Sequence, residues 1–257
     1  MRTADDEKML AGLLSSVEIQ KFVKVESVVR QPQIQNVRET VKAALENCPA
    51  LKRILPGQQV AVTAGSREIN HIGEILSAVG EAVRGRGATA FIVPAMGSHG
   101  GADARGQTEV LRHYGITEET VGMEIRSSME TVLLGKTPDG LEVYLDANAM
   151  RADHIIPVGR IKAHTDFSGP VESGLVKMLV IGLGKQQGAS ICHREGFPRM
   201  GDNLLKFVKV ILEKAPVIFG VGIVENSVHE PALVEAVEAE RILLREPELL
   251  SYSKSLM

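Results

Sequence analysis

The sequence predicts an α/β fold in which helices flank a mainly parallel sheet, with an added hairpin. Short β-rich runs at 59–64 and 89–95 are separated by a segment with helical spacing, the order expected of a βαβ unit. Hydrophobic residues make up 44% of the 257 residues and charged residues 24%, which is typical of a globular protein with a sizeable core. Since no repeat, low-complexity segment or clear linker interrupts the chain, we expect one α/β domain over 1–257.

The first half of the chain supplies a helix between these two runs and another after them. The segment IGEILSAVGEAVRG, residues 72–85, repeats its apolar residues at helical spacing and ends in glycine. A second helix is predicted over 103–114, with Asp103 at its start and Gly115 just past its end as a C-cap. These helices connect successive strands of the expected sheet.

The remaining elements follow from turn residues and apolar runs. The stretch TVLLGKTPDGLEVYL reads as a hairpin whose turn is Pro138-Asp139-Gly140. Further expected elements are buried strands at 154–161 and 216–226, a helix at 203–215, an additional strand at 17–29, and a charged helical tail from 230 onward.

Charge and composition exclude several classes of partner. The formal net charge is −3 and no basic stripe with interleaved aromatic residues is present, so we expect neither a nucleic-acid nor a membrane-surface partner. The N-terminus MRTADDEKML is acidic where a signal peptide is basic, and no apolar run reaches transmembrane length. Two cysteines, Cys48 and Cys192, fit reduced thiols. These features predict a cytoplasmic protein.

Chemistry in parallel sheets lies in the loops that follow the strands, and three such loops carry reactive side chains. After 59–64, Ser66-Arg67 places a guanidinium where it can bind a carboxylate or phosphate, or simply cap a helix. After 89–95, the run GSHGG places His99 among glycines, which suits a base that titrates near neutral pH. A solvated histidine in a turn is the competing interpretation.

A third loop, after 154–161, leads into an unusual lysine. It carries His164 and a small-residue turn, and then Lys177 lies inside an apolar, glycine-flanked run. A desolvated lysine has a lowered pKa and becomes nucleophilic, although a lysine extending from an amphipathic helix would produce the same pattern. The later Gly182-Leu183-Gly184-Lys185 lacks the GxxxxGK[ST] pattern, so it does not predict a phosphate loop.

Together these motifs resemble a known family. Ser66-Arg67, GSHGG at 97–101, HTDFSG at 164–169, and Lys177 followed sixteen positions later by His193 are similar to the N-terminal domain of the nickel-dependent lactate racemase family. The resemblance covers roughly residues 55–225 in order. It implies an isomerase that racemises or epimerises a 2-hydroxy acid such as lactate, with that small molecule as substrate.

The resemblance also implies a cofactor and its binding residues. The cofactor would be a nickel-pincer nucleotide, pyridinium-3,5-bisthiocarboxylic acid mononucleotide with nickel, attached to Lys177, with His193 as a nickel ligand. His99 and His164 would be the two catalytic bases. Arg67, Ser98 and Ser168 would bind the cofactor, Arg67 alternatively anchoring the substrate carboxylate.

The implied chemistry accounts for these residue types. The α-hydrogen of a 2-hydroxy acid is poorly acidic because the neighbouring group is already an anionic carboxylate. Hydride removal avoids the carbanion, and return of hydride on the opposite face requires a base on each side, which explains two histidines. A covalently attached cofactor removes positional entropy from each transfer.

The sequence also departs from the family. Ala64 stands where an aspartate is common, and Pro170-Val171-Glu172-Ser173 are additional residues between His164 and Lys177. Family members are typically longer, so we expect this chain to correspond to the N-terminal half, with the C-terminal domain absent or supplied by a partner chain. The alternative is a non-catalytic module that binds an anionic small molecule or a divalent metal through Arg67, His99 and His164. A hydrolytic zinc enzyme is less favoured because HExxH spacing is missing.

Overall fold

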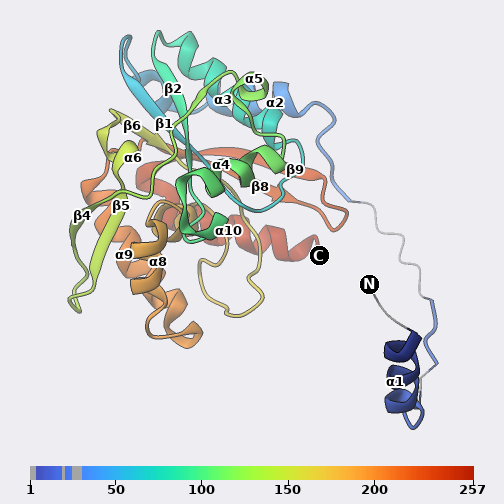
Figure 1. Cartoon of the computed structure of the whole chain (residues 1–257). Helices are drawn as coiled ribbons and strands as arrows, with labels where there is room; N and C mark the ends of the chain where they lie inside the picture. The colour runs from blue at the N-terminus through green and yellow to red at the C-terminus, as the bar shows by residue number, and fades with distance from the viewer. Residues whose placement is uncertain (1–3, 19–20, 25–30) are drawn as a thin grey trace. The chain divides into compact units, whose positions relative to one another are not determined.

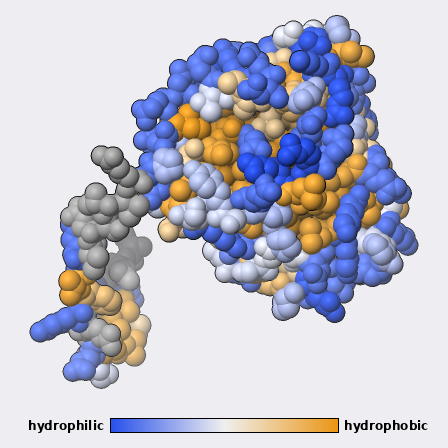
Figure 2. All heavy atoms as spheres, turned by 180° about the vertical axis from the view of Figure 1, so that it is seen from behind, coloured by the Kyte–Doolittle hydropathy of each residue, from blue (hydrophilic) through white to orange (hydrophobic). Residues whose placement is uncertain are grey.

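The computed structural model describes the whole chain except residues 1–3, 19–20 and 25–30, and it divides into two compact units, 1–30 and 31–257. The small unit contains helix α1 (Ala4–Leu14), whose Met9 and Leu13 side chains are exposed, and both apolar and hydrophilic patches are visible on it (Figure 2). The strand predicted at 17–29 is wrong for 17–18 and 21–24, which are not in a strand; its other residues lie outside the described part. A strand needs a partner, and no described sheet extends to these residues.

The larger unit is built on a parallel sheet, which confirms the predicted fold class (Figure 1). The strand order is β3-β2-β1-β6. The bounds are β1 Gln59–Ala64, β2 Thr89–Pro94, β3 Glu124–Ile125 and β6 His154–Ile156. The register of β1 and β2 ends at the pair Ala64 and Pro94, so the loops after these two strands begin side by side.

Both faces of this sheet are covered, as the apolar runs of β1 and β2 require. Val60 and Val62 pack into one core with helices α2 (Val37–Glu46) and α3 (Ile72–Gly85). Ala61, the next residue along, packs into the other core together with helix α9 (Met200–Lys214). Side chains that alternate between faces therefore fill two separate cores. The predicted helices at 72–85 and 203–215 are confirmed.

A second sheet continues from the first, with the order β7-β8-β9. Its strands are β7 Val158–Arg160, β8 Phe219–Glu225 and β9 Pro231–Glu238. The single strand predicted at 154–161 is divided at Pro157, which has no N–H for a continuous ladder, so β6 pairs with β1 while β7 pairs with β8.

The helical tail predicted from 230 is wrong in its first part. Residues 231–238 form strand β9, antiparallel to β8, and helix α10 (Ile242–Ser255) begins only after it. The buried residues Pro231, Val234 and Val237 recur every third position, which imitates helical spacing. Pairing with β8 decides the conformation, because strand preference depends on the partner more than on the local pattern.

The hairpin is confirmed as β4 (Thr131–Lys136) and β5 (Glu142–Asp146), with Gly140 at φ +86° in its turn. The helix predicted at 103–114 is α4 (Ala104–His113), capped by the Asp103 side chain. The remaining helices are α5 Glu118–Val121, α6 Ala147–Arg151, α7 Leu175–Lys177 and α8 Lys185–His193, the π-helical turn η3 Met178–Gly182, and the 3-10 turns η1 Pro49–Arg53, η2 Gly100–Ala102, η4 Phe197–Arg199 and η5 Ala239–Arg241. Within the described ranges, no helix combines the length and apolar character needed to cross a bilayer.

Candidate functional site

The three loops singled out by sequence follow the carboxyl ends of β1, β2 and β7. They bring Arg67, His99 and His164 close enough to Lys177 for their charges to influence one another's pKa. Arg67 and His99 are exposed, whereas His164 and Lys177 are half-buried. The arrangement is an open surface site whose deepest reactive group is the lysine.

Lys177 ends helix α7 and continues directly into the π-helical turn. Burial, with the Arg67 guanidinium as the next cause, lowers the pKa of the Lys177 ammonium from 10.5 to about 8. Its Nζ lies 5.9 Å from the ring centroid of Phe167. A lysine with this pKa is partly a free amine near neutral pH, which is the form that attacks an electrophile.

His99 lies in the glycine-rich loop after β2. Its Nδ1 is 2.5 Å from the Ser66 hydroxyl oxygen, which comes from the loop after β1. Partial burial, Arg67 and Lys177 all lower the pKa of His99, in that order of size. The ring is therefore mainly neutral at pH 7 and can accept a proton.

His164 is held differently. The Asp166 backbone N–H donates to His164 Nδ1 over 3.1 Å, so a neutral ring carries its proton on Nε2. The ring lies 4.4 Å, centroid to centroid, from that of Phe167. Burial and then Lys177 lower the pKa of His164, while Asp166 opposes the shift. The two histidines thus have distinct hydrogen-bonding roles.

His193 ends helix α8 and is linked to the other residues through Phe197. The Phe197 ring centroid lies 6.5 Å from that of His193 and 6.4 Å from that of His164. His193 Nδ1 is 2.6 Å from the Ala189 carbonyl oxygen, so Nδ1 carries the proton and Nε2 keeps its lone pair. This is the form in which imidazole binds a metal ion. Among the described residues, no group of three or more His, Cys, Asp or Glu could hold a metal.

Ser98 and Ser168 are both exposed, and neither side chain bonds to another described residue. The structure brings in further residues to which the sequence assigned no role: Ser66, Phe167, Phe197 and Lys162. Lys162 lies near Arg67, since burial, Arg160 and Arg67 lower the pKa of Lys162. Phe167 was visible inside the HTDFSG motif, whereas no sequence signal indicated that Phe197 connects two histidines.

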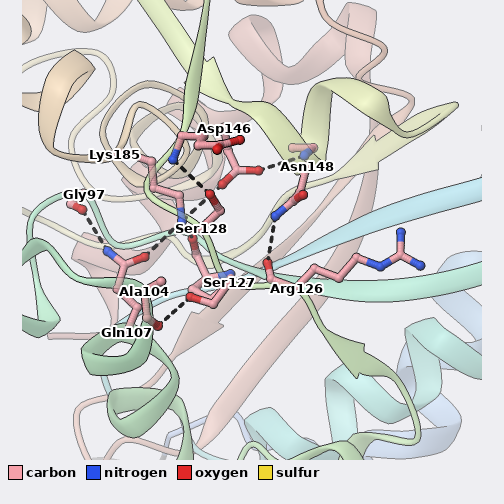
Figure 3. A network of polar contacts seen from close by, with 12 residues as sticks. Gly97, Ala104, Gln107, Arg126, Ser127, Ser128, Asp146, Asn148 and Lys185 are labelled. Carbon is pink, nitrogen blue, oxygen red and sulfur yellow. Dashed lines mark hydrogen bonds and ion pairs between the residues drawn. The ribbon is translucent and has the colours of Figure 1, made fainter.

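A buried polar network supports the His99 loop (Figure 3). Lys185 is fully buried, and its Nζ donates to the Pro94 carbonyl at 2.5 Å and to Gln107 Oε1 at 2.9 Å. Gln107 Nε2 in turn donates to the carbonyl oxygens of Gly97 and His99, at 2.9 and 3.2 Å.

The same lysine forms an ion pair with Asp146, 3.3 Å from Oδ2, with both side chains fully buried. Lys185 also adopts a left-handed backbone conformation, with φ +54°, which is unfavourable for a lysine and persists because its contacts hold it there. Since Lys185 begins helix α8, the network connects the His99 loop to the helix that ends at His193. It supports the site without lying in it.

Comparisons with known proteins bear on the family and the fold. The family model described as "Lactate racemase N-terminal domain" matches residues 11–199. The structure of the lactate racemase apoprotein from Thermoanaerobacterium thermosaccharolyticum is similar, with a TM-score of 0.62 and 19% sequence identity. The match covers 84% of this chain and 55% of that one, so this chain spans about half the length of that protein. No curated protein sequence matches significantly.

Proposed function

Because this chain belongs to the lactate racemase N-terminal domain family, we propose that it is the cofactor-attaching domain of a racemase or epimerase that acts on a 2-hydroxy acid. The observation that carries the proposal is the half-buried amine of Lys177, whose pKa is about 8, surrounded by Arg67, His99 and His164. Ionisable groups whose pKa values are shifted by burial and by one another's charges cluster at functional sites.

The donor set fits a nickel-pincer nucleotide. Lys177 offers the amine for covalent attachment, and His193 Nε2 offers one imidazole ligand. Since the described residues provide no group of three metal-binding side chains, the other nickel donors would come from the organic group. When bound, this cofactor supplies a carrier that accepts hydride from the substrate carbon and returns it.

The chain's own residues would bind substrate and move protons. Arg67 is exposed, and no described residue forms an ion pair with its guanidinium, so it is free to bind the substrate carboxylate. His99, in the tautomer whose Nδ1–H donates to the Ser66 hydroxyl, would accept the substrate hydroxyl proton at Nε2. His164 would be the base on the other face, where it takes up a proton at one step and its protonated form returns that proton to the substrate oxygen at the next. Ser98 and Ser168 remain proposed contacts to the cofactor.

The rest of the catalytic site would come from elsewhere. This chain spans about half of the similar lactate racemase, and Arg67 and His99 lie on an exposed surface. We therefore propose that a second domain or a partner chain covers this surface and excludes water from the reaction.

Mass spectrometry tests the attachment. The chain is produced together with the enzymes that make the cofactor, and peptide mapping locates any added mass. We expect an adduct on Lys177 that disappears in Lys177→Arg, while Lys162→Arg, a neighbouring lysine, keeps it. Full racemase activity from a chain with unmodified Lys177 would contradict the proposal.

A non-catalytic anion-binding module is the second candidate, favoured by one observation. Arg67, Lys162 and Lys177 lie near one another, and within the described residues none of the three forms an ion pair. Calorimetric titration with lactate and with nickel separates the two functions. Binding that survives Lys177→Ala but is lost in His99→Ala and His164→Ala favours the module.

A further inference from the structure

We infer that the C-terminal helix α10 positions the reactive residues of the site: Glu246 holds the helix that carries Lys177, and Lys254 holds, through Glu172, the loop that carries His164. The contacts are independent of any cofactor, but their purpose rests on the proposed function. Helix α10 lies beyond residues 11–199, the range that the family model matches.

Glu246 contacts the backbone of the residue that precedes Lys177. Its side chain is 1% exposed, and Oε2 accepts a hydrogen bond from the Val176 backbone N–H at 2.9 Å. This N–H belongs to the first turn of α7, where no earlier carbonyl is available to it. A Cβ on Gly174 would collide with Glu246 Oε1, so a larger residue there would displace the carboxylate. The carboxylate thus fixes the start of the helix that ends at Lys177.

Glu172 holds the His164 loop in place through two hydrogen bonds to its backbone. Its side chain is 1% exposed, Oε2 accepts the His164 backbone N–H at 2.7 Å, and Oε1 accepts that of Gly169 at 3.2 Å. The two bonds close the loop on both sides of its tip. Glu172 belongs to the additional residues 170–173 that separate this sequence from the family pattern.

Lys254 connects Glu172, and with it the His164 loop, to α10. Its Nζ lies 2.7 Å from Glu172 Oε1, although Lys254 itself is 45% exposed. A buried carboxylate is costly unless it is paired, so the ammonium is what allows Glu172 to stay ionised inside the loop. Burial raises the pKa of Glu172, but the bonds from Lys254, His164 and Gly169 outweigh it and leave that pKa below 4.5.

One helix therefore sets the spacing of two reactive groups that come from different loops. Glu246 and Lys254 lie two turns apart on α10, and each acts on one site segment. They are positioning residues, because neither side chain contacts the Lys177 amine or the His164 ring in the described structure. Shifting α10 would move Lys177 and His164 together.

Hydrogen exchange tests the Lys254 contact in the cofactor-free chain. In Lys254→Met, we expect amides in 164–172 to exchange at least tenfold faster, while those of β1 and β2 are unchanged. Ser255→Ala is the matched control, since the Ser255 hydroxyl bonds only to the Tyr252 carbonyl within α10. Unchanged exchange in 164–172 would overturn this half of the inference.

Amine acylation, followed by mass spectrometry against pH, tests Glu246. In Glu246→Leu we expect the Lys177 titration midpoint to rise above about 8, because the freed helix exposes the amine. Glu246→Gln keeps an oxygen acceptor for Val176 and should restore the midpoint, which a loss of packing alone would not explain. If Glu246→Leu does not fold, the acylation midpoint of Glu246→Gln and the exchange rates of Lys254→Met still test the inference. A midpoint unchanged in Glu246→Leu, or altered equally in both variants, overturns the inference.

These tests are separate from the test of function. They use the chain without cofactor and measure positions and amine reactivity. Absence of an adduct on Lys177 would reject the proposed function and leave the α10 contacts standing, whereas unchanged exchange and acylation would reject the contacts alone.

Discussion

Lys185 Nζ donates to Gln107 Oε1 over 2.9 Å in the protein interior, and Gln107 Nε2 in turn donates to the Gly97 and His99 carbonyls, so Gln107 links the helix that ends at His193 to the loop that carries His99. The ammonium has three hydrogens and meets three oxygen groups: Gln107, the Pro94 carbonyl and the Asp146 carboxylate. A buried charge that is matched in this way is costly to disturb, because each oxygen would lose its partner without gaining water.

Replacing Lys185 should therefore destabilise the fold strongly. In Lys185→Met we expect the free energy of unfolding in urea to fall by about 3–5 kcal/mol, since Asp146 is left buried without its counter-ion. Lys206→Met is the matched control: Lys206 also pairs with an aspartate, Asp139, but at the surface, and its loss should change stability little. A loss in Lys185→Met no larger than in the control would contradict this explanation.

A double variant separates the charge from the packing. Asp146→Asn keeps a side-chain oxygen to cap Ala149, which Asp146 Oδ1 does at 2.8 Å, but removes the unpaired charge. Lys185→Met combined with Asp146→Asn should therefore recover about 1 kcal/mol or more relative to Lys185→Met alone. If the two losses simply add, the ion pair is not the source of the stability.

Lys177 should titrate as an unusually acidic amine. Acylation of the cofactor-free chain, followed residue by residue, should give a midpoint at about pH 8 for Lys177. In Arg67→Ala the midpoint should rise, because the guanidinium that repels the ammonium is gone, yet it should stay below 10.5 since burial is the larger cause. In Asp166→Asn it should fall, because Asp166 stabilises the ammonium. Either shift in the opposite direction would contradict the assigned contacts.

The same arginine should act on His99. Its pKa lies below 6.5 because of burial first and Arg67 second, so NMR titration of the ring should show a higher pKa in Arg67→Ala. His154, whose pKa is lowered by burial but not by Arg67, is the internal control and should not move. A common shift of both rings would indicate a change of fold.

The sequence predicted the sheet better than the ends of the chain. The apolar runs that became β1 and β2 form parallel strands buried on both faces, so their composition alone indicated their place. Strand β9 was missed because its buried residues recur every third position, and only its pairing with β8 reveals it. The local sequence pattern predicts strands that are buried on both faces. It fails for a strand whose conformation depends on pairing with one particular neighbour.

The candidate site was predictable only in its chemistry-bearing residues. Arg67, His99 and His164 follow strands, and this placement alone indicated a shared edge. The residues that hold these side chains in place could not be recognised from the sequence. Lys185 stood in a segment that lacks the full phosphate-loop pattern, and Glu172 stood among the additional residues 170–173. Both act through contacts with residues far away in sequence, Gln107 and Lys254, and no spacing rule reports such pairs.

Glu246 should make stability depend on pH in a direction opposite to that of a salt-bridged acid. Burial raises the pKa of Glu246 to about 7 in the folded chain, against 4.5 for the free side chain. The folded state thus holds the proton more tightly, so this contribution is fully present below pH 4.5 and is lost as pH rises through 7. The shift corresponds to at most about 3 kcal/mol.

Glu246→Gln removes the titration while keeping an oxygen for the Val176 N–H. Urea unfolding of both proteins from pH 4.5 to 8 should show the variant gaining stability relative to the parent as pH rises. Histidines whose pKa is lowered by burial, such as His164, make both proteins more stable at higher pH, and their effect cancels in the difference. A difference that stays constant across this range would mean that Glu246 has the same pKa in the folded and unfolded chain, and that its carboxylate is ionised over most of the range.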